Sequence, residues 1–410
     1  MFQTKFMLKF RLSDKDFTRE RKLSFTRLVL MQINMLKASL QKEIVSFFQL
    51  IDTEVKLSKS AFSQRRQKLL PEAFVDLNEV LIDAYYADDD FLKWKGFRLT
   101  AIDGSTMNLP YSKEIEDFFG TLENQTNIKL PMAKISSCYD VLNEIILDGQ
   151  ISSYVTSEYD LAIKHLEKLK RGDLVLFDRG YGANWLFLLL IHKKIDFAIR
   201  ISRSLFIDFW SSDCRSKIVT ITSCSKESSD KLKKMGIEFK DTKVRLVKVI
   251  LDTGEIEVLV TSLYSKTKYP DKIFKNLYSM RWGIEQNYNH LKNHIEIENL
   301  SGKSVFAVKQ DFFANILIEN IRSLIASDAQ IEIDEQKNNL KYKYKVNKNL
   351  SIGFLKDEII RLLLSKDPDY IEKIIDLFTI EPVPVRPNRH VNRKHNKSMK
   401  RHRVNYRRSF

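Results

Sequence analysis

Residues 97–202 alternate between short apolar runs and amphipathic stretches, and this order constrains the fold more than any other feature of the chain. "FRLTAIDGS" predicts a strand that ends at Asp103, with Gly104 permitting a tight turn. "AKISSCYDVLNEIILDGQISSY" predicts two strands joined near Asn143. A helix, a buried strand ending at Asp178 ("DLVLFDRGYG"), a second helix and the strand of "DFAIRIS" follow. Strand, hairpin, helix, strand, helix, strand is the order of a mixed α/β sheet.

The flanking regions differ from residues 97–202 in composition and periodicity. Residues 1–96 combine Leu, Phe and Ile with many Lys and Arg and few glycines, which predicts helices. A polar, strand-rich segment with a turn signal at Asp252-Thr253-Gly254 interrupts the alternation, and helices resume at Pro270. These changes divide the chain into a helical N-terminal region (1–96), the first part of an α/β core (97–202), a β-rich insertion (203–265), the second part of the core (266–330), a helical C-terminal region (331–385) and a basic tail without hydrophobic periodicity, expected to be disordered (386–410).

The chain of 410 residues carries a net charge of +15, which favours a polyanionic partner, nucleic acid first. The tail contributes ten Lys or Arg and no acid. The longest apolar run, "WLFLLLI", has seven residues, well short of the roughly 18 that span a bilayer. The N-terminus lacks the pattern of a secretion signal, and the three cysteines have no metal-ligand spacing. We therefore expect a cytoplasmic protein without a membrane partner.

The N-terminal region contains a candidate helix-turn-helix. Residues 36–69 suggest a helix, a turn and a second helix, which Ser58 or Ser60 would cap. Ser63, Gln64, Arg65 and Arg66 of that second helix could reach phosphates or base edges in a major groove, so we expect DNA binding here. A helical subdomain that only packs against the core is the alternative interpretation.

Two aspartates follow apolar strands. Strand ends face the ligand crevice in open α/β sheets, and this places Asp103 and Asp178 at one edge. An aspartate there is also a common turn starter, so either one alone could be structural. A glutamate joining them would complete a set of oxygen ligands suited to Mg²⁺, whose charge would neutralise phosphate oxygens.

The stretch "YSMRWGIEQNYNHLK" supplies that glutamate. On a helix turning about 100° per residue, Tyr278, Arg281, Glu285 and Lys292 share an arc of roughly 60° beside a core-facing stripe. An acid, two cations and a phenol in one column could hold a phosphate near a metal. An ordinary amphipathic helix with an i, i+4 Arg–Glu pair is the alternative.

Together, "AIDGSTMNLP", "LVLFDRGYGANWLF" and the Y-x2-R-x3-E-x6-K spacing resemble the DDE transposases of bacterial insertion sequences, in the cut-and-paste class with the Y-R-E-K signature (the insertion sequence family four type). The resemblance spans roughly residues 55–330 and implies an RNase H-like core. It also implies that Asp103, Asp178 and Glu285 bind the catalytic metal and that Tyr278, Arg281 and Lys292 contact DNA phosphates. Family members can carry a base-stacking tryptophan in the insertion; the matching strand here, "EIEVLVTS", has none, and neither Trp210 nor Trp282 is assigned the role.

The predicted function is a prokaryotic, nucleoid-associated transposase that cleaves double-stranded DNA at terminal inverted repeats and transfers the freed ends into target DNA. Two Mg²⁺ ions, which Mn²⁺ could replace, and a homodimer in the synaptic complex are implied by the resemblance. A catalytically inactive DNA-binding relative and a Mg²⁺-dependent structure-specific nuclease remain alternatives.

Overall fold

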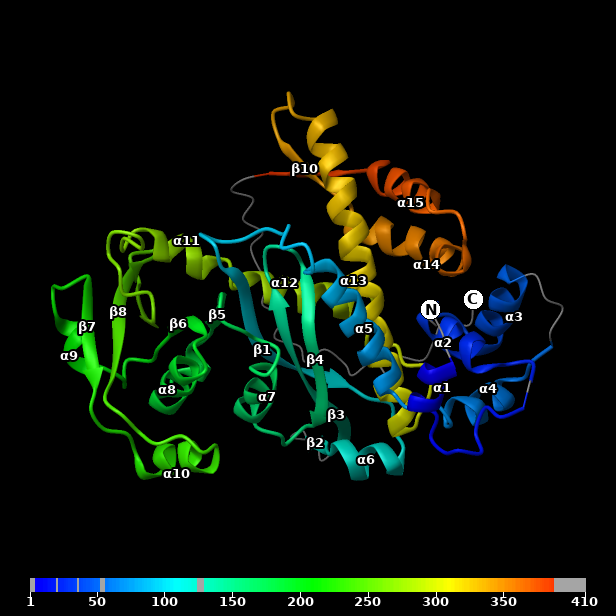
Figure 1. Ribbon diagram of the computed structural model, residues 1–410, viewed down its shortest axis with the longest axis horizontal. Coiled ribbons are helices and arrows are strands. Elements are labelled where there is room, and N and C mark those ends of the chain that lie inside the picture. Colours follow the sequence, from blue (N-terminus) through cyan, green and yellow to red (C-terminus); the bar gives the residue numbers. More distant parts are fainter. Residues whose placement is uncertain (1–3, 20, 35–36, 52–55, 124–128, 387–410) are drawn as a thin grey trace.

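A computed structural model describes residues 4–19, 21–34, 37–51, 56–123 and 129–386 (Figure 1). A long mixed sheet occupies the middle of the molecule, and the N-terminal helices lie beside one end of it (Figure 1). Residues 387–410 of the predicted basic tail lie outside the described residues. No helix in the described part of the chain is long and apolar enough to cross a membrane.

Five strands form the core of the sheet in the order β4-β3-β1-β5-β6. Strands β3 and β4 form the predicted hairpin, β3 runs antiparallel to β1, and β1, β5 and β6 run parallel. This is the strand arrangement of an RNase H-like core, so the predicted fold class is confirmed. The bounds are β1 (Arg98–Asn108), β3 (Lys129–Asp140), β4 (Ile145–Ser153), β5 (Asp173–Phe177) and β6 (Asp196–Arg200).

The strands between residues 203 and 265 extend this sheet. Strand β9 pairs antiparallel with β6, and β8 and β7 follow at the edge. The turn between β8 and β9 lies at the predicted Asp252-Thr253-Gly254, where Gly254 takes a positive φ of 83° that favours glycine. The elements are α9 (Ile207–Ser211), β7 (Ser216–Ile221), α10 (Lys226–Lys234), β8 (Thr242–Ile250) and β9 (Ile256–Thr261).

Helices cover both faces of the core. Strand β5 is buried on both sides, and its residues after Asp173 are all apolar. Leu174 and Leu176 belong to one hydrophobic cluster, and Val175 and Phe177 belong to the other. The second cluster includes α7 (Glu158–His165), the 3-10 turn η1 (Arg179–Tyr181) and α8 (Asn184–His192). The first includes α5 (Glu72–Tyr85), α11 (Ile273–Ser279), α12 (Trp282–Asn293) and α13 (Val305–Gln336).

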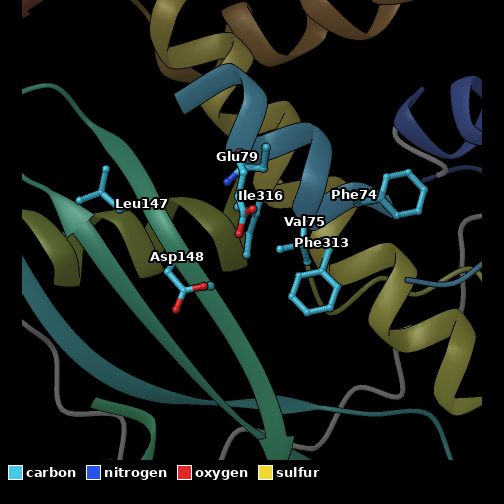
Figure 2. A pocket seen from close by; sticks show the side chains of 9 residues that line it. Phe74, Val75, Glu79, Leu147, Asp148, Phe313 and Ile316 are labelled. Atoms are coloured by element: carbon cyan, nitrogen blue, oxygen red, sulfur yellow. The ribbon is translucent and has the colours of Figure 1, made fainter. Parts of the chain in front are cut away.

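Helix α13 packs against β4 and α5. It approaches β4 closely at Gly149, where an added Cβ would lie 2.1 Å from Cδ1 of Ile316. A small pocket remains between the three elements, and Figure 2 shows the side chains that line it from α5, β4 and α13. The 32 residues of α13 run past residue 330, so the helix continues across the predicted start of the C-terminal region. Helix α13 ends at Gln336, inside the predicted C-terminal region.

The remaining elements lie outside the central sheet, except β2, which pairs with the start of β3. The N-terminal helices are α1 (Thr4–Phe10), α2 (Phe25–Ile33), α3 (Leu40–Leu50) and α4 (Lys59–Arg66). The C-terminal elements are α14 (Lys348–Leu364), α15 (Tyr370–Thr379) and the pair β10 (Lys343–Lys345) and β11 (Val383–Val385). Helix α6 (Lys113–Phe119) and β2 (Thr121–Glu123) connect β1 to β3.

Candidate active site

Asp103 lies inside β1 and not at its end, which corrects the prediction. The strand continues to Asn108 because its antiparallel ladder with β3 runs on through Gly104, whose backbone is not in the positive-φ region. Pairing with the parallel neighbour β5 stops earlier, at Ala101. Asp103 therefore lies two positions beyond the last parallel pair, at the edge where β5 ends.

Asp178 follows β5 directly, as predicted. Its side chain caps the η1 turn by accepting a hydrogen bond of 2.8 Å from the N–H of Gly180. A Cβ at Gly180 would lie 3.0 Å from that carboxylate oxygen, so glycine allows the tight turn. Because β1 and β5 are adjacent and parallel, Asp103 and Asp178 lie at one edge of the sheet.

The Y-R-E-K stretch is two helices and not one. Helix α11 ends at Ser279 and α12 begins at Trp282. Between them, N–H groups bond to carbonyls three residues back, from Arg281 to Tyr278 and from Ile284 to Arg281, both at 3.1 Å. This tighter turn interrupts the α-helical hydrogen-bond pattern between the two helices, yet the Arg281 guanidinium still lies 5.7 Å from the ring centroid of Tyr278. Tyr278 is buried and donates a 3.3 Å hydrogen bond to the carbonyl of Phe177.

One face of α12 and the residue before it dock onto β1. Arg281 donates a 2.6 Å hydrogen bond to Glu285, and another of its guanidinium nitrogens lies 3.9 Å from Asp103. Lys292 donates a 2.8 Å hydrogen bond to Ser105. The structure thus brings Asp103, Glu285, Arg281 and Lys292 together.

The charges at this edge interact strongly. The pKa of Asp103 is raised to about 6, chiefly by burial; the carboxylates of Asp178 and Glu285 contribute to this rise, whereas the Gly104 N–H and Arg281 oppose it. The Arg281 side chain is only 9% exposed and reaches two of the acids. The buried guanidinium neutralises the charge of these carboxylates, as a bound metal ion would also do.

The three acids suit a hard cation by chemistry, since all offer oxygen ligands. Within the described ranges, however, no three His, Cys, Asp or Glu side chains are arranged to hold a metal ion. The Arg281–Glu285 ion pair is one physical reason, because it directs Glu285 toward the guanidinium.

Arg65 and Arg66, predicted to contact DNA, are both buried in the N-terminal region. Ser58 caps α4, one of the two predicted options, by accepting from the N–H of Ala61 at 3.2 Å. Arg65 donates to the carbonyl of Leu23 at 3.1 Å and lies 4.0 Å from the ring centroid of Phe17. Arg66 forms hydrogen bonds with residues of α2, α13 and the loop before α13: Gln32, Ser301, Ala307, Gln310 and Asp311. Both arginine side chains are largely buried, which corrects the surface position expected for a DNA-reading face.

Sequence reasoning missed residues that surround Asp103. The hydroxyl of Tyr288 donates to the carbonyl of Asp103 at 2.8 Å, and that of Ser136 donates to the same oxygen at 3.0 Å. Glu158 lies against the next residue, since a Cβ at Gly104 would be 3.2 Å from its side chain. Tyr288 could have been found, because it lies three positions after Glu285 and four before Lys292 on the same helical face.

Two bacterial proteins are similar to this chain in sequence. The chain is 23% identical over 270 residues to "Transposase InsG for insertion sequence element IS4" of Escherichia coli strain K12, which covers 65% of this chain and 60% of the relative. It is 26% identical over 144 residues to "Putative transposase InsZ" of the same organism, which covers 33% of this chain and 47% of that protein. The chain thus matches less than two thirds of the length of either relative.

A solved structure, that of the piggyBac transposase synaptic complex with hairpin DNA, aligns with 95% of this chain and 83% of its own at 11% identity and a TM-score of 0.40. Because this TM-score is low, the fold assignment rests on the strand order of the sheet. Residues 94–321, more than half of the chain, match the family described as "Transposase DDE domain" and contain all three acids at the sheet edge. The chain therefore belongs to the DDE transposase family.

Proposed function

We propose that the protein is a transposase that cleaves DNA at the ends of its own insertion sequence and joins those ends to target DNA. The observation that carries this proposal is the meeting of Asp103, Asp178 and Glu285 from three separate segments at one sheet edge. Asp103 and Asp178 each lie two positions beyond the last paired residues of the parallel strands β1 and β5. Arg281 links Asp103 to Glu285.

In this proposal Asp103, Asp178 and Glu285 hold Mg²⁺, or Mn²⁺ in its place. When bound, the ions would neutralise phosphate oxygens and lower the pKa of water, which makes it a stronger nucleophile toward a phosphodiester. Arg281 already pairs with Glu285, so metal binding must compete with this ion pair. Release of Arg281 would provide a guanidinium able to bind a phosphate through two parallel hydrogen bonds. Tyr278 and Lys292 are proposed to contact DNA phosphates beside it.

The substrate proposed here is double-stranded DNA, first the terminal inverted repeats and then the target. The net charge of +15 favours such a polyanion. Bringing two ends together implies a homodimer on DNA.

The test is incubation of the full chain with duplexes that carry the repeats flanking its own gene, in Mg²⁺ and in EDTA. Scrambled repeats of the same length and composition are the matched control. Metal-dependent nicks confined to the repeat ends support the proposal. Metal-dependent nicks at any sequence would indicate a nuclease, and binding without nicks would indicate an inactive DNA-binding relative.

A further inference from the structure

The peptide carbonyl of Asp103 is held from two sides by side-chain hydroxyls. Ser136 of β3 donates to it at 3.0 Å, and Tyr288 of α12 donates to it at 2.8 Å. Ser136 is fully buried and Tyr288 is 6% exposed, so water does not easily replace either donor. A carbonyl oxygen has two lone pairs and can accept both bonds at once.

Two further residues orient the Ser136 hydroxyl. His165 of α7, also fully buried, places Nε2 2.9 Å from Ser136 Oγ and Nδ1 2.6 Å from Asp148 of β4. The carbonyl of Asp103 can only accept, so its bond with Ser136 uses the single hydroxyl proton of the serine. Whenever that bond forms, Nε2 of His165 is the donor to Ser136 Oγ. Asp148, which also lines the pocket of Figure 2, accepts from Nδ1.

Asp148 is suited to that role. Burial opposes its ionisation, but the hydrogen bond and charge of His165 outweigh burial and lower the pKa of Asp148. Gln150 also donates to this carboxylate, at 2.9 Å. A buried chain of hydrogen bonds therefore runs from Asp148 through His165 and Ser136 to the backbone of Asp103.

Tyr288 connects the same carbonyl to the other half of the site. It lies one helical turn after Glu285, so its hydroxyl links β1 to the helix that carries the third acid. Asp103 and Glu285 repel each other when both are ionised. A link between strand and helix would resist that repulsion without touching either carboxylate.

We propose that Ser136 and Tyr288 are positioning residues that clamp the Asp103 carbonyl and keep the carboxylates of Asp103 and Glu285 in register for the reaction. The proposal rests on the proposed function for its catalytic meaning, while the clamp itself is a property of the metal-free protein. Neither hydroxyl is offered as a ligand of metal or DNA.

The experiment compares full-length wild type with Ser136→Ala, Tyr288→Phe and the double variant. Two controls remove hydroxyl-to-carbonyl bonds at less buried places: Ser153 donates to the carbonyl of Phe119 at 3.0 Å, and Tyr264 donates to that of Lys243 at 2.6 Å. Ser153→Ala, Tyr264→Phe and their double variant therefore report the general effect of losing such bonds. Each protein is assayed for end affinity, for single-turnover nicking of bound DNA, and for metal-free hydrogen exchange of the amides at 102–106.

Each single clamp variant should slow nicking about tenfold without weakening end affinity, because the carbonyl keeps one partner. The double variant should lose more than the product of the single losses, since a buried carbonyl is then unpaired. Exchange at 102–106 should rise locally in the double variant.

Nicking rates equal to those of the controls would overturn the clamp. So would a rate loss that comes with a uniform rise in exchange across the sheet, because that would show a purely structural role. If wild type itself fails to nick repeat ends, the proposed function fails. Local exchange at 102–106 then decides whether the clamp exists.

Discussion

At the sheet edge, Asp103, Asp178 and Glu285 come from three distant segments, yet Asp178 and Glu285 lie close enough to raise the pKa of Asp103. On helix α4, Arg65 and Arg66 are neighbours in sequence, and both are buried. Motif reasoning assigned both groups to DNA chemistry. The positions of the residues at the sheet edge depend on the order of strands, which the alternation of strands and helices in the sequence reveals. Which face of a helix is buried depends instead on the elements that pack against it.

The partner of Arg66 explains the difference. Asp311 and Gln310 accept from Arg66 at 2.8 Å, and both lie on α13, more than 240 residues away. Phe62, one turn earlier on α4, is also fully buried. The buried face of α4 thus mixes an aromatic residue with two arginines. The exposed face carries Lys59, Ser60, Ser63 and Gln64.

The largest effect should come from the acids at the edge. Asp103→Asn, Asp178→Asn and Glu285→Gln each remove a charge with little change of shape, so each should reduce repeat-end nicking by about 1,000-fold or more. End affinity should persist or increase, because a negative charge near phosphate is lost. Single-turnover nicking and gel-shift titration measure both quantities. Near wild-type nicking in any one variant would remove that residue from the site.

Arg66→Ala should act on stability and not on chemistry. It leaves Asp311 buried without its ion-pair partner, which should lower the free energy of unfolding by about 3–5 kcal/mol. Urea denaturation measures this change. The matched control is Gln64→Ala on the exposed face, expected to stay within about 0.5 kcal/mol of wild type. Unchanged stability together with lost DNA binding would return Arg66 to its predicted role.

The raised pKa of Asp103 predicts how the stability of the protein depends on pH. The folded protein keeps the proton of Asp103 up to about pH 6, whereas the ordinary value is 3.8. The contribution of Asp103 to the stability of wild type should therefore fall as pH rises from about 4 to 6. In EDTA, Asp103→Asn should be more stable than wild type by about 2 kcal/mol above pH 6 and equal to it below pH 4.

Urea denaturation across this pH range measures the difference. Asp14→Asn removes a carboxylate that is 98% exposed and controls for the change in net charge. Parallel pH curves for wild type and Asp103→Asn would mean that Asp103 is not strained in the metal-free protein.

Local pattern predicted the sheet, the hairpin and the place of Asp178, because alternation and turn residues are set within a few positions. It misplaced the end of β1, since continuation to Asn108 depends on pairing with β3. It also joined α11 and α12 into one helix, because the helical periodicity continues across the tight turn at Arg281 and the single Gly283 does not reveal the break. Tyr288 and Ser136 escaped notice since a buried carbonyl acceptor is visible only after folding.

The smallest effect concerns the exposed face of α4. If α3 and α4 form a DNA-reading pair, Gln64 and Ser63 are its base readers, since amide and hydroxyl groups match base edges in the major groove. Gln64→Ala should then reduce the preference for repeat ends over random duplex by about tenfold, an effect of about 1 kcal/mol, with an unchanged salt slope. Lys59→Ala, one turn earlier, should instead weaken binding to all sequences and reduce the salt slope by about 1. Competition titrations at several salt concentrations separate the two effects. If both variants bind like wild type, α4 only packs against the core, and recognition of the repeat lies elsewhere in the chain.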